Sequence, residues 1–217
     1  MTKKTISIIA VIIVIILGAT TYAFRGELFP KAAQPAQPAT TPSATEQADK
    51  SSSTYKQYTA MTGELYDRNF IANMIAHHQG AVDMAKLAVT NAKHKELVDM
   101  AHNIISAQEK EINDMTAWQK EWGYPSTSAD DMMDHSAMGM MESTGNMMAQ
   151  LDGKTGDDFD KAFLEQMIMH HQSAIDMAAS GKDNASRQEL KDLTVAIVDA
   201  QTKEIQQMEQ WQKEWGY

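Results

Sequence analysis

Apolar residues recur at intervals of three and four along most of the chain, which is the spacing of α-helices that bury one face. At about 100° per residue, one arc of a helix collects eight side chains: Phe70, Met74, His77, His78, Ala81, Met84, Ala85 and Ala88. Both histidines therefore face the predicted core. Between the motifs there is no strand signal, so the pattern predicts an all-α protein.

The pattern occurs twice, at an offset of 93 residues. MIAHHQGAVDMA begins at Met74, and MIMHHQSAIDMA begins at Met167. Residues 107–124 recur as 200–217 with 13 of 18 positions identical, and the whole unit 60–124 repeats as 153–217. Turn residues interrupt each unit near Asn91 and at 181–184. We therefore predict two duplicated helical hairpins, over 55–124 and 157–217.

Two hairpins with short turns predict an up-down-up-down four-helix bundle. In that arrangement the first and third helices lie diagonal to one another and run the same way. The pair His77/His78 would then face the pair His170/His171 at one level. Glu111, and Glu204 in the second copy, lie in the apolar stripes of the other two helices. A carboxylate at such a position needs a partner, and we expect a histidine or a tryptophan N–H.

The segments before the first hairpin point to a location outside the cytoplasm. In residues 1–25, Lys3 and Lys4 precede an apolar run from Ile6 to Phe24 that is long enough to span a membrane. An uncleaved anchor is favoured, with a cleaved secretory signal as the alternative. The lysines keep the N-terminus cytoplasmic and place the remainder outside. Residues 26–54 are rich in Pro, Ala, Ser and Thr and are predicted to form a disordered linker.

Methionine dominates the segment between the hairpins. The chain contains 17 Met and no Cys, and residues 125–156 form a predicted acidic, Met-rich loop without helix or strand period. Residues 51–217 carry 14 Lys and Arg against 26 Asp and Glu, a balance that repels nucleic acid and attracts cations. We expect no nucleic-acid partner.

Methionine and histidine together are the ligands of soft metal ions, namely Cu(I) and Ag(I). Outside the cytoplasm a thioether has two advantages over a thiolate, since it binds without losing a proton and forms no disulfide. In the Met-rich segment the predicted ligands are Met132, Met133, His135, Met138, Met140, Met141, Met147 and Met148.

The two histidine motifs, each followed by a helix ending in E-I-x-x-M-x-x-W, resemble the bacterial domain-of-unknown-function family 305. The resemblance covers residues 60–217. It implies a ferritin-like fold, and a link to copper because some periplasmic members take part in copper resistance. The ligands that it implies are Met74, His77, His78 and Met84 in the first copy, and Met167, His170, His171 and Met177 in the second.

These features predict an extracytoplasmic copper-binding protein, anchored in the membrane by its N-terminal helix. It would bind Cu(I), and Cu(II) or Ag(I) as well, and sequester the metal or pass it to an acceptor or exporter protein. We do not expect an enzyme. His94 and His102 have no counterpart in the second copy and are predicted to lie on the surface.

Three alternatives remain open from the sequence. In the first alternative, the repeated His and Met residues are structural core residues. The second is a ferritin-like di-iron or di-manganese enzyme, for which two core glutamates are few and no Glu-x-x-His motif is present. The third is a metal-independent interaction module.

Overall fold

The computed structural model describes residues 44–125 and 134–217, with side chains over 46–125 and 142–217. Within these ranges the chain forms helices and no strand, which confirms the all-α prediction for them. The helices are α1 (Ala44–Gln47), α2 (Ser53–Thr59), α3 (Glu64–Asn91), α4 (Lys95–Glu121), α5 (Asp134–Leu151), α6 (Gly156–Ala178), α7 (Gly181–Asn184) and α8 (Gln188–Trp215).

The second helix of each hairpin, α4 or α8, ends in the same way in both copies because both ends have the sequence QKEWGY. Gly123 after α4 and Gly216 after α8 have φ of 72° and 76°, a left-handed conformation that favours glycine. In each copy the amide of the next residue, Tyr124 or Tyr217, donates a hydrogen bond of 2.9 Å to the carbonyl five residues earlier. Duplicated sequence thus gives duplicated helix ends.

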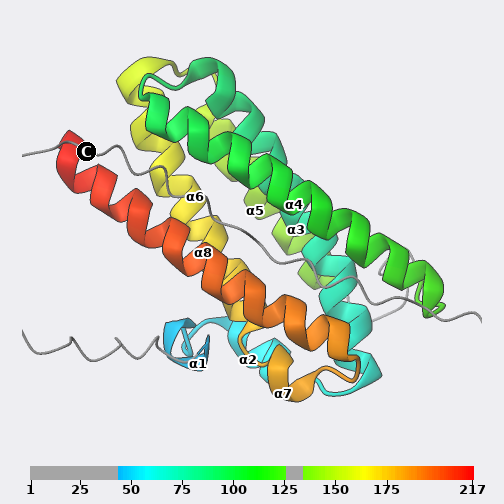
Figure 1. The fold of residues 1–217 in the computed structure, drawn as a ribbon. Coiled ribbons are helices and arrows are strands. Elements are labelled where there is room, and N and C mark those ends of the chain that lie inside the picture. Colours follow the sequence, from blue (N-terminus) through cyan, green and yellow to red (C-terminus); the bar gives the residue numbers. More distant parts are fainter. Residues whose placement is uncertain (1–43, 126–133) are drawn as a thin grey trace, which may run out of the picture. The chain divides into compact units, whose positions relative to one another are not determined.

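The predicted hairpins are present, since α3 packs along α4 and α6 packs along α8 (Figure 1). The predicted relation between α3 and α6 is wrong. The amide of Gly63, at the start of α3, bonds at 2.7 Å to the carbonyl of Asn184, the last residue of the short helix α7 that follows α6. At the other end, the amide of Lys93 after α3 bonds to Asp160 in the first turns of α6, at 2.9 Å. The two helices therefore run antiparallel and contact each other directly.

An approximately two-fold arrangement explains this difference. Short turns fix the direction of neighbouring helices within a hairpin, but α5, an 18-residue helix, separates the two hairpins and leaves their relative direction free. Two copies of one sequence then pack through the same face, as in an isologous dimer. The histidine pairs face each other as predicted, but across this approximate two-fold axis.

The linker prediction is wrong for residues 44–54. These residues pack on the second hairpin: the amide of Asp49 and the hydroxyl of Ser52 both donate to the buried carboxylate of Asp176, each at 2.7 Å. Ala48 is buried beside them. A carboxylate that accepts two such bonds offsets the entropic cost of ordering a polar segment, and composition alone does not reveal that partner.

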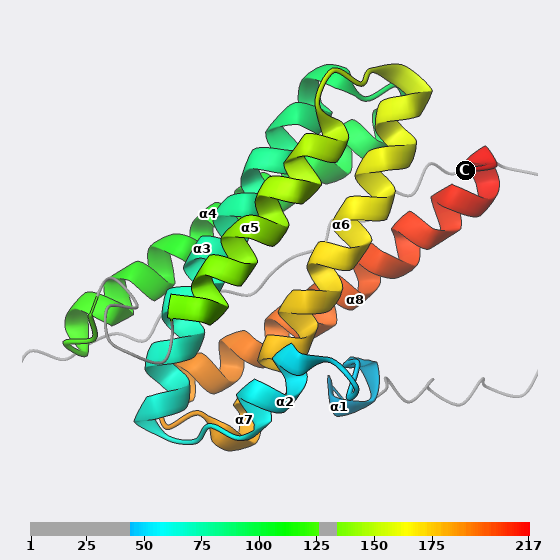
Figure 2. The ribbon, with the colours of Figure 1, turned by 180° about the vertical axis from the view of Figure 1, so that it is seen from behind.

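The Met-rich segment is also more regular than predicted, since residues 134–151 form α5 and not a loop. This helix packs on α3 and α6 (Figure 2). Its position is equivalent to that of α1 and α2, because the 93-residue offset maps 44–60 onto 137–153. Tertiary packing, which sequence periodicity does not report, accounts for the helix.

Several predictions fall on residues outside the described ranges. These are the anchor at 1–25, the linker residues 26–43, and Met132 and Met133. His135, Met138, Met140 and Met141 belong to α5, but their side chains lie outside the described set. In the part of the chain that the structure covers, no helix has the length and apolar character needed to cross a membrane.

Candidate metal centre

Both histidine pairs are buried at the crossing of α3 and α6, as their helical register predicts. The exposed fraction is at most 4% for each of His77, His78, His170 and His171. The rings of His77 and His170 meet across the approximate two-fold axis, with 3.7 Å between their centroids. One histidine from each copy therefore lies at the centre of the molecule's core.

The outer histidine of each pair is held by a glutamate from the partner helix of its own hairpin. His78 Nε2 lies 2.7 Å from Glu111 Oε2, and His171 Nε2 lies 2.7 Å from Glu204 Oε2. The predicted carboxylate–histidine partnership is confirmed. An ionised carboxylate only accepts, so each Nε2 carries the hydrogen, and in a neutral imidazole Nδ1 is then the atom that can bind a metal.

Seven buried nitrogen and oxygen atoms here have no hydrogen-bond partner among the described residues. They are Nδ1 of His77, His78, His170 and His171, Nε2 of His170, and Oε1 of Gln108 and Gln201. We call these six residues the histidine layer. A buried polar atom without a partner costs about 1–3 kcal/mol, so a concentration of them in one layer requires a physical reason.

Burial keeps the two inner histidines neutral. Loss of hydration holds the pKa of His77 and of His170 well below the usual range, and the neighbouring histidines lower both further. A neutral imidazole is the form that ligates a metal. The fold therefore presents unprotonated nitrogen ligands even in mildly acidic surroundings.

Gly80 lies close to both Thr144 of α5 and His170. A Cβ atom at this position would lie 3.4 Å from His170 Nε2 and 2.6 Å from Thr144 Cγ2 of α5. The second copy has Ser173 at the equivalent place. The missing side chain thus lets Thr144 of α5 approach α3 closely beside the His170 ring.

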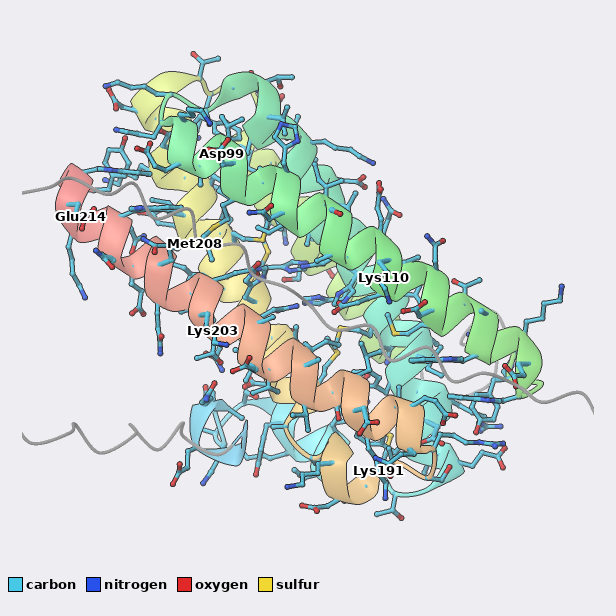
Figure 3. All side chains as sticks on the ribbon, viewed as in Figure 1. Asp99, Lys110, Lys191, Lys203, Met208 and Glu214 are labelled. Carbon is cyan, nitrogen blue, oxygen red and sulfur yellow. The ribbon has the colours of Figure 1, made fainter. Side chains whose placement is uncertain are left out.

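The four predicted helix-borne methionines lie on either side of the histidine layer, and all are fully buried. Met74 and Met177 belong to one apolar cluster, whereas Met84 and Met167 belong to a second cluster. The second cluster also contains Met208 of α8 (Figure 3). Each cluster thus combines methionines from both copies and encloses the histidines from one side.

No group of three or more His, Asp or Glu side chains in the described ranges is arranged to hold a metal ion. The imidazoles of His77 and His170 are in contact, with 3.7 Å between their centroids. The other nitrogen donors of the layer are the Nδ1 atoms of His78 and His171, and buried methionines flank it. Imidazole with thioether suits a soft monovalent ion that accepts a low coordination number.

The methionines predicted in the linking segment are described only in part. Met147 and Met148, near the end of α5, are half-buried and pack against the second apolar cluster. The remaining six ligands predicted there lie outside the described side chains. Their role therefore remains a prediction from the sequence.

The surface prediction holds for His102 and is wrong for His94. His94 is half-buried, its Nδ1 lies 2.6 Å from Asp160 Oδ2, and its ring stacks on Trp215 at 3.8 Å. The equivalent residue of the second copy is Arg187, which lies over the Trp122 ring at 5.1 Å. The sequence contained a signal for this contact, since positions 94 and 187 are equivalent and carry His and Arg, two residue types that can stack on the tryptophans of the repeat.

Comparison with known proteins identifies the family. The sequence model of the protein family DUF305, a domain of unknown function, matches residues 67–212. The chain belongs to the DUF305 family. A comparison with curated proteins gave no match.

Solved structures with the DUF305 arrangement include CopM in several metal-bound forms. CopM in its Cu(I)-bound form is 37% identical, with a TM-score of 0.56 over 69% of this chain and 96% of CopM. CopM with silver, obtained by co-crystallisation, is 39% identical over the same shares, also with a TM-score of 0.56. A DUF305 protein from Streptomyces coelicolor, named as secreted, is 25% identical, with a TM-score of 0.62 over 70% of this chain and 94% of that one. The likeness of this DUF305 chain to CopM supports a metal-binding role.

Proposed function

We propose that this protein binds copper, as Cu(I) and also as Cu(II) or Ag(I), to sequester it or pass it on. The observation that carries the proposal is the histidine layer, with four buried imidazoles whose Nδ1 atoms have no partner in the described residues. A core built only for stability would replace these groups with apolar ones. A metal ion supplies the partner that the nitrogen atoms lack.

The glutamates support the same reading. Metal-binding histidines usually donate their other N–H to a carboxylate, which fixes the ring and makes the ligating nitrogen more basic. Glu111 and Glu204 occupy that position toward His78 and His171. His78 and His171 would therefore bind a metal ion through Nδ1. His77 and His170 would bind through their unpartnered nitrogens, and the flanking methionines through sulfur.

The ion preference follows from the donors. Imidazole with thioether suits Cu(I) and Ag(I), and imidazole alone suits Cu(II) as well. CopM, which is similar over 69% of this chain, has been solved with all three ions. A location outside the cytoplasm is supported by the secreted Streptomyces relative. Anchoring by residues 1–25, and an acceptor or exporter protein as partner, belong to the proposal as sequence-based predictions.

We propose a binding role and not a catalytic one. Each core glutamate is engaged by one histidine, and a di-iron or di-manganese enzyme needs a larger set of carboxylates around its two ions. Neither glutamate is free to bridge a second metal. The metal would thus be cargo.

A competition titration of the full chain against a Cu(I) chelator tests the proposal. His77→Gln/His170→Gln should lower affinity for the tightest equivalent by about 10-fold or more, because each change removes a neutral nitrogen donor. The control is His94→Gln/His102→Gln, which removes two histidines outside the layer and should leave the titration unchanged. Equal curves for both variants and the wild type would contradict a role for the layer.

A further inference from the structure

Met169 on α6 has an unusual position for a large apolar residue. The residue is 50% exposed. Among the large apolar residues that the structure describes, Leu65 and Val195 are the only others that are exposed. Its equivalent in the first copy is Ala76, so duplication does not account for the methionine. An exposed thioether contributes little packing and is open to oxidation. Its presence requires another reason.

A second methionine lies beside it. Met169 and Met147 line one surface hollow of about 400 Å³ between α5 and α6, which run side by side in Figure 2. In the first copy, Thr54 takes the place of Met147. Both thioethers of the hollow are therefore specific to the second copy, and they come from two different helices.

The remaining walls of the hollow are polar, and among them are Glu142, Asn146 and Gln166. None of its lining residues carries a positive charge. Two thioether sulfurs with a carboxylate and amide oxygens form a donor set for a soft cation, and hard ions such as Mg²⁺ or Ca²⁺ gain nothing from the sulfur. The net negative charge of the chain attracts cations to this surface.

We propose that Met147 and Met169 form a solvent-open site for a soft monovalent ion, Cu(I) or Ag(I), distinct from the histidine layer. The site lies on the outer face of the turn of α6 whose inner face carries the buried His170. Thr144, one turn before Met147 in α5, contacts the inner side near Gly80. An ion bound at the hollow is thus exposed to solvent and exchangeable, whereas one in the layer is enclosed.

Methyl NMR of the full chain, labelled with ¹³C at the methionine methyl groups, tests this site with Ag(I) as the probe. The Met147 and Met169 signals, assigned with single Met→Leu variants, should shift together at one dissociation constant. Met169→Leu should weaken the response at Met147 by about tenfold, because one of two sulfur donors is lost. Met100→Leu is the matched control, because Met100 is a half-buried methionine of the second apolar cluster that does not line the hollow; this variant should leave both responses in place.

Two results would overturn the site: a Met169 signal that does not move with Ag(I), or a Met147 response that is the same in Met169→Leu as in the wild type. The same titration in His77→Gln/His170→Gln separates this site from the proposed function. The hollow should respond in that variant as in the wild type, whatever happens at the layer. Loss of the hollow response there would mean that the thioethers only report binding at the histidines.

Discussion

The metal-free protein should lose stability on acidification, by about 1 kcal/mol for each of His77 and His170 between pH 7.5 and 5.5. Burial holds the pKa of both side chains well below the usual range in the folded protein, whereas the unfolded chain titrates them near pH 6.5. Below that pH the unfolded state binds protons that the folded state does not, so the free energy of unfolding falls as pH falls. Urea denaturation at pH 7.5, 6.5 and 5.5 measures it.

The His77→Gln/His170→Gln variant should show a flatter pH dependence, because glutamine does not titrate. His94→Gln/His102→Gln is the control, since it removes the same number of histidines and leaves the layer intact; its pH dependence should stay steep. If the two variants lost equal stability on acidification, the inner histidines would not be the buried neutral groups that the structure describes. A metal that binds only the folded state should counteract the acid-induced loss.

The second large effect concerns the glutamates. Glu111→Gln/Glu204→Gln should weaken Cu(I) binding by about 10–100-fold, the usual result of losing a carboxylate behind a ligating histidine. An amide still accepts a hydrogen bond from Nε2, so the fold should be retained, but it no longer makes the Nδ1 atom more basic. Chelator competition measures the affinity, and circular dichroism checks the helices.

Glu109→Gln is the matched control for these changes. Glu109 lies in α4 two residues before Glu111, is half exposed, and pairs with Lys86 at 3.5 Å on the surface. An exposed ion pair contributes little, so this variant should bind copper as the wild type does. If Glu111→Gln/Glu204→Gln also bound copper with wild-type affinity, Glu111 and Glu204 would serve only the stability of the core.

Within one hairpin, the sequence was informative enough to predict most of the site. Helical register placed His77 and His78 on the buried face of α3, and the position of Glu111 in an apolar stripe required a partner that proved to be His78. Both inferences rest on the regular geometry of a single helix and on the cost of burying a charge. The duplication then extended them to the second copy.

Relations between distant segments could not be predicted in this way. The antiparallel contact of α3 with α6 depends on how two equivalent faces fit together, which periodicity does not encode. Helix α5 and residues 44–54 acquire their positions from contacts with α3, α6 and Asp176, although their compositions favour irregular structure. Met169 was not predicted as a ligand because the ligands on these helices were inferred from residues that both copies share, and the first copy has Ala76 at the equivalent position.

X-ray absorption at the copper edge identifies the atoms bound to copper directly, and it can be measured on the full chain loaded with one equivalent of Cu(I). The histidine layer predicts imidazole nitrogen in the first shell, with the multiple scattering typical of histidine, and its loss in His77→Gln/His170→Gln. A first shell of sulfur alone in the wild type, unchanged in that variant, would show that the histidine layer does not bind copper. Copper would then be bound by the methionines only, and the repeated histidine pairs would be structural.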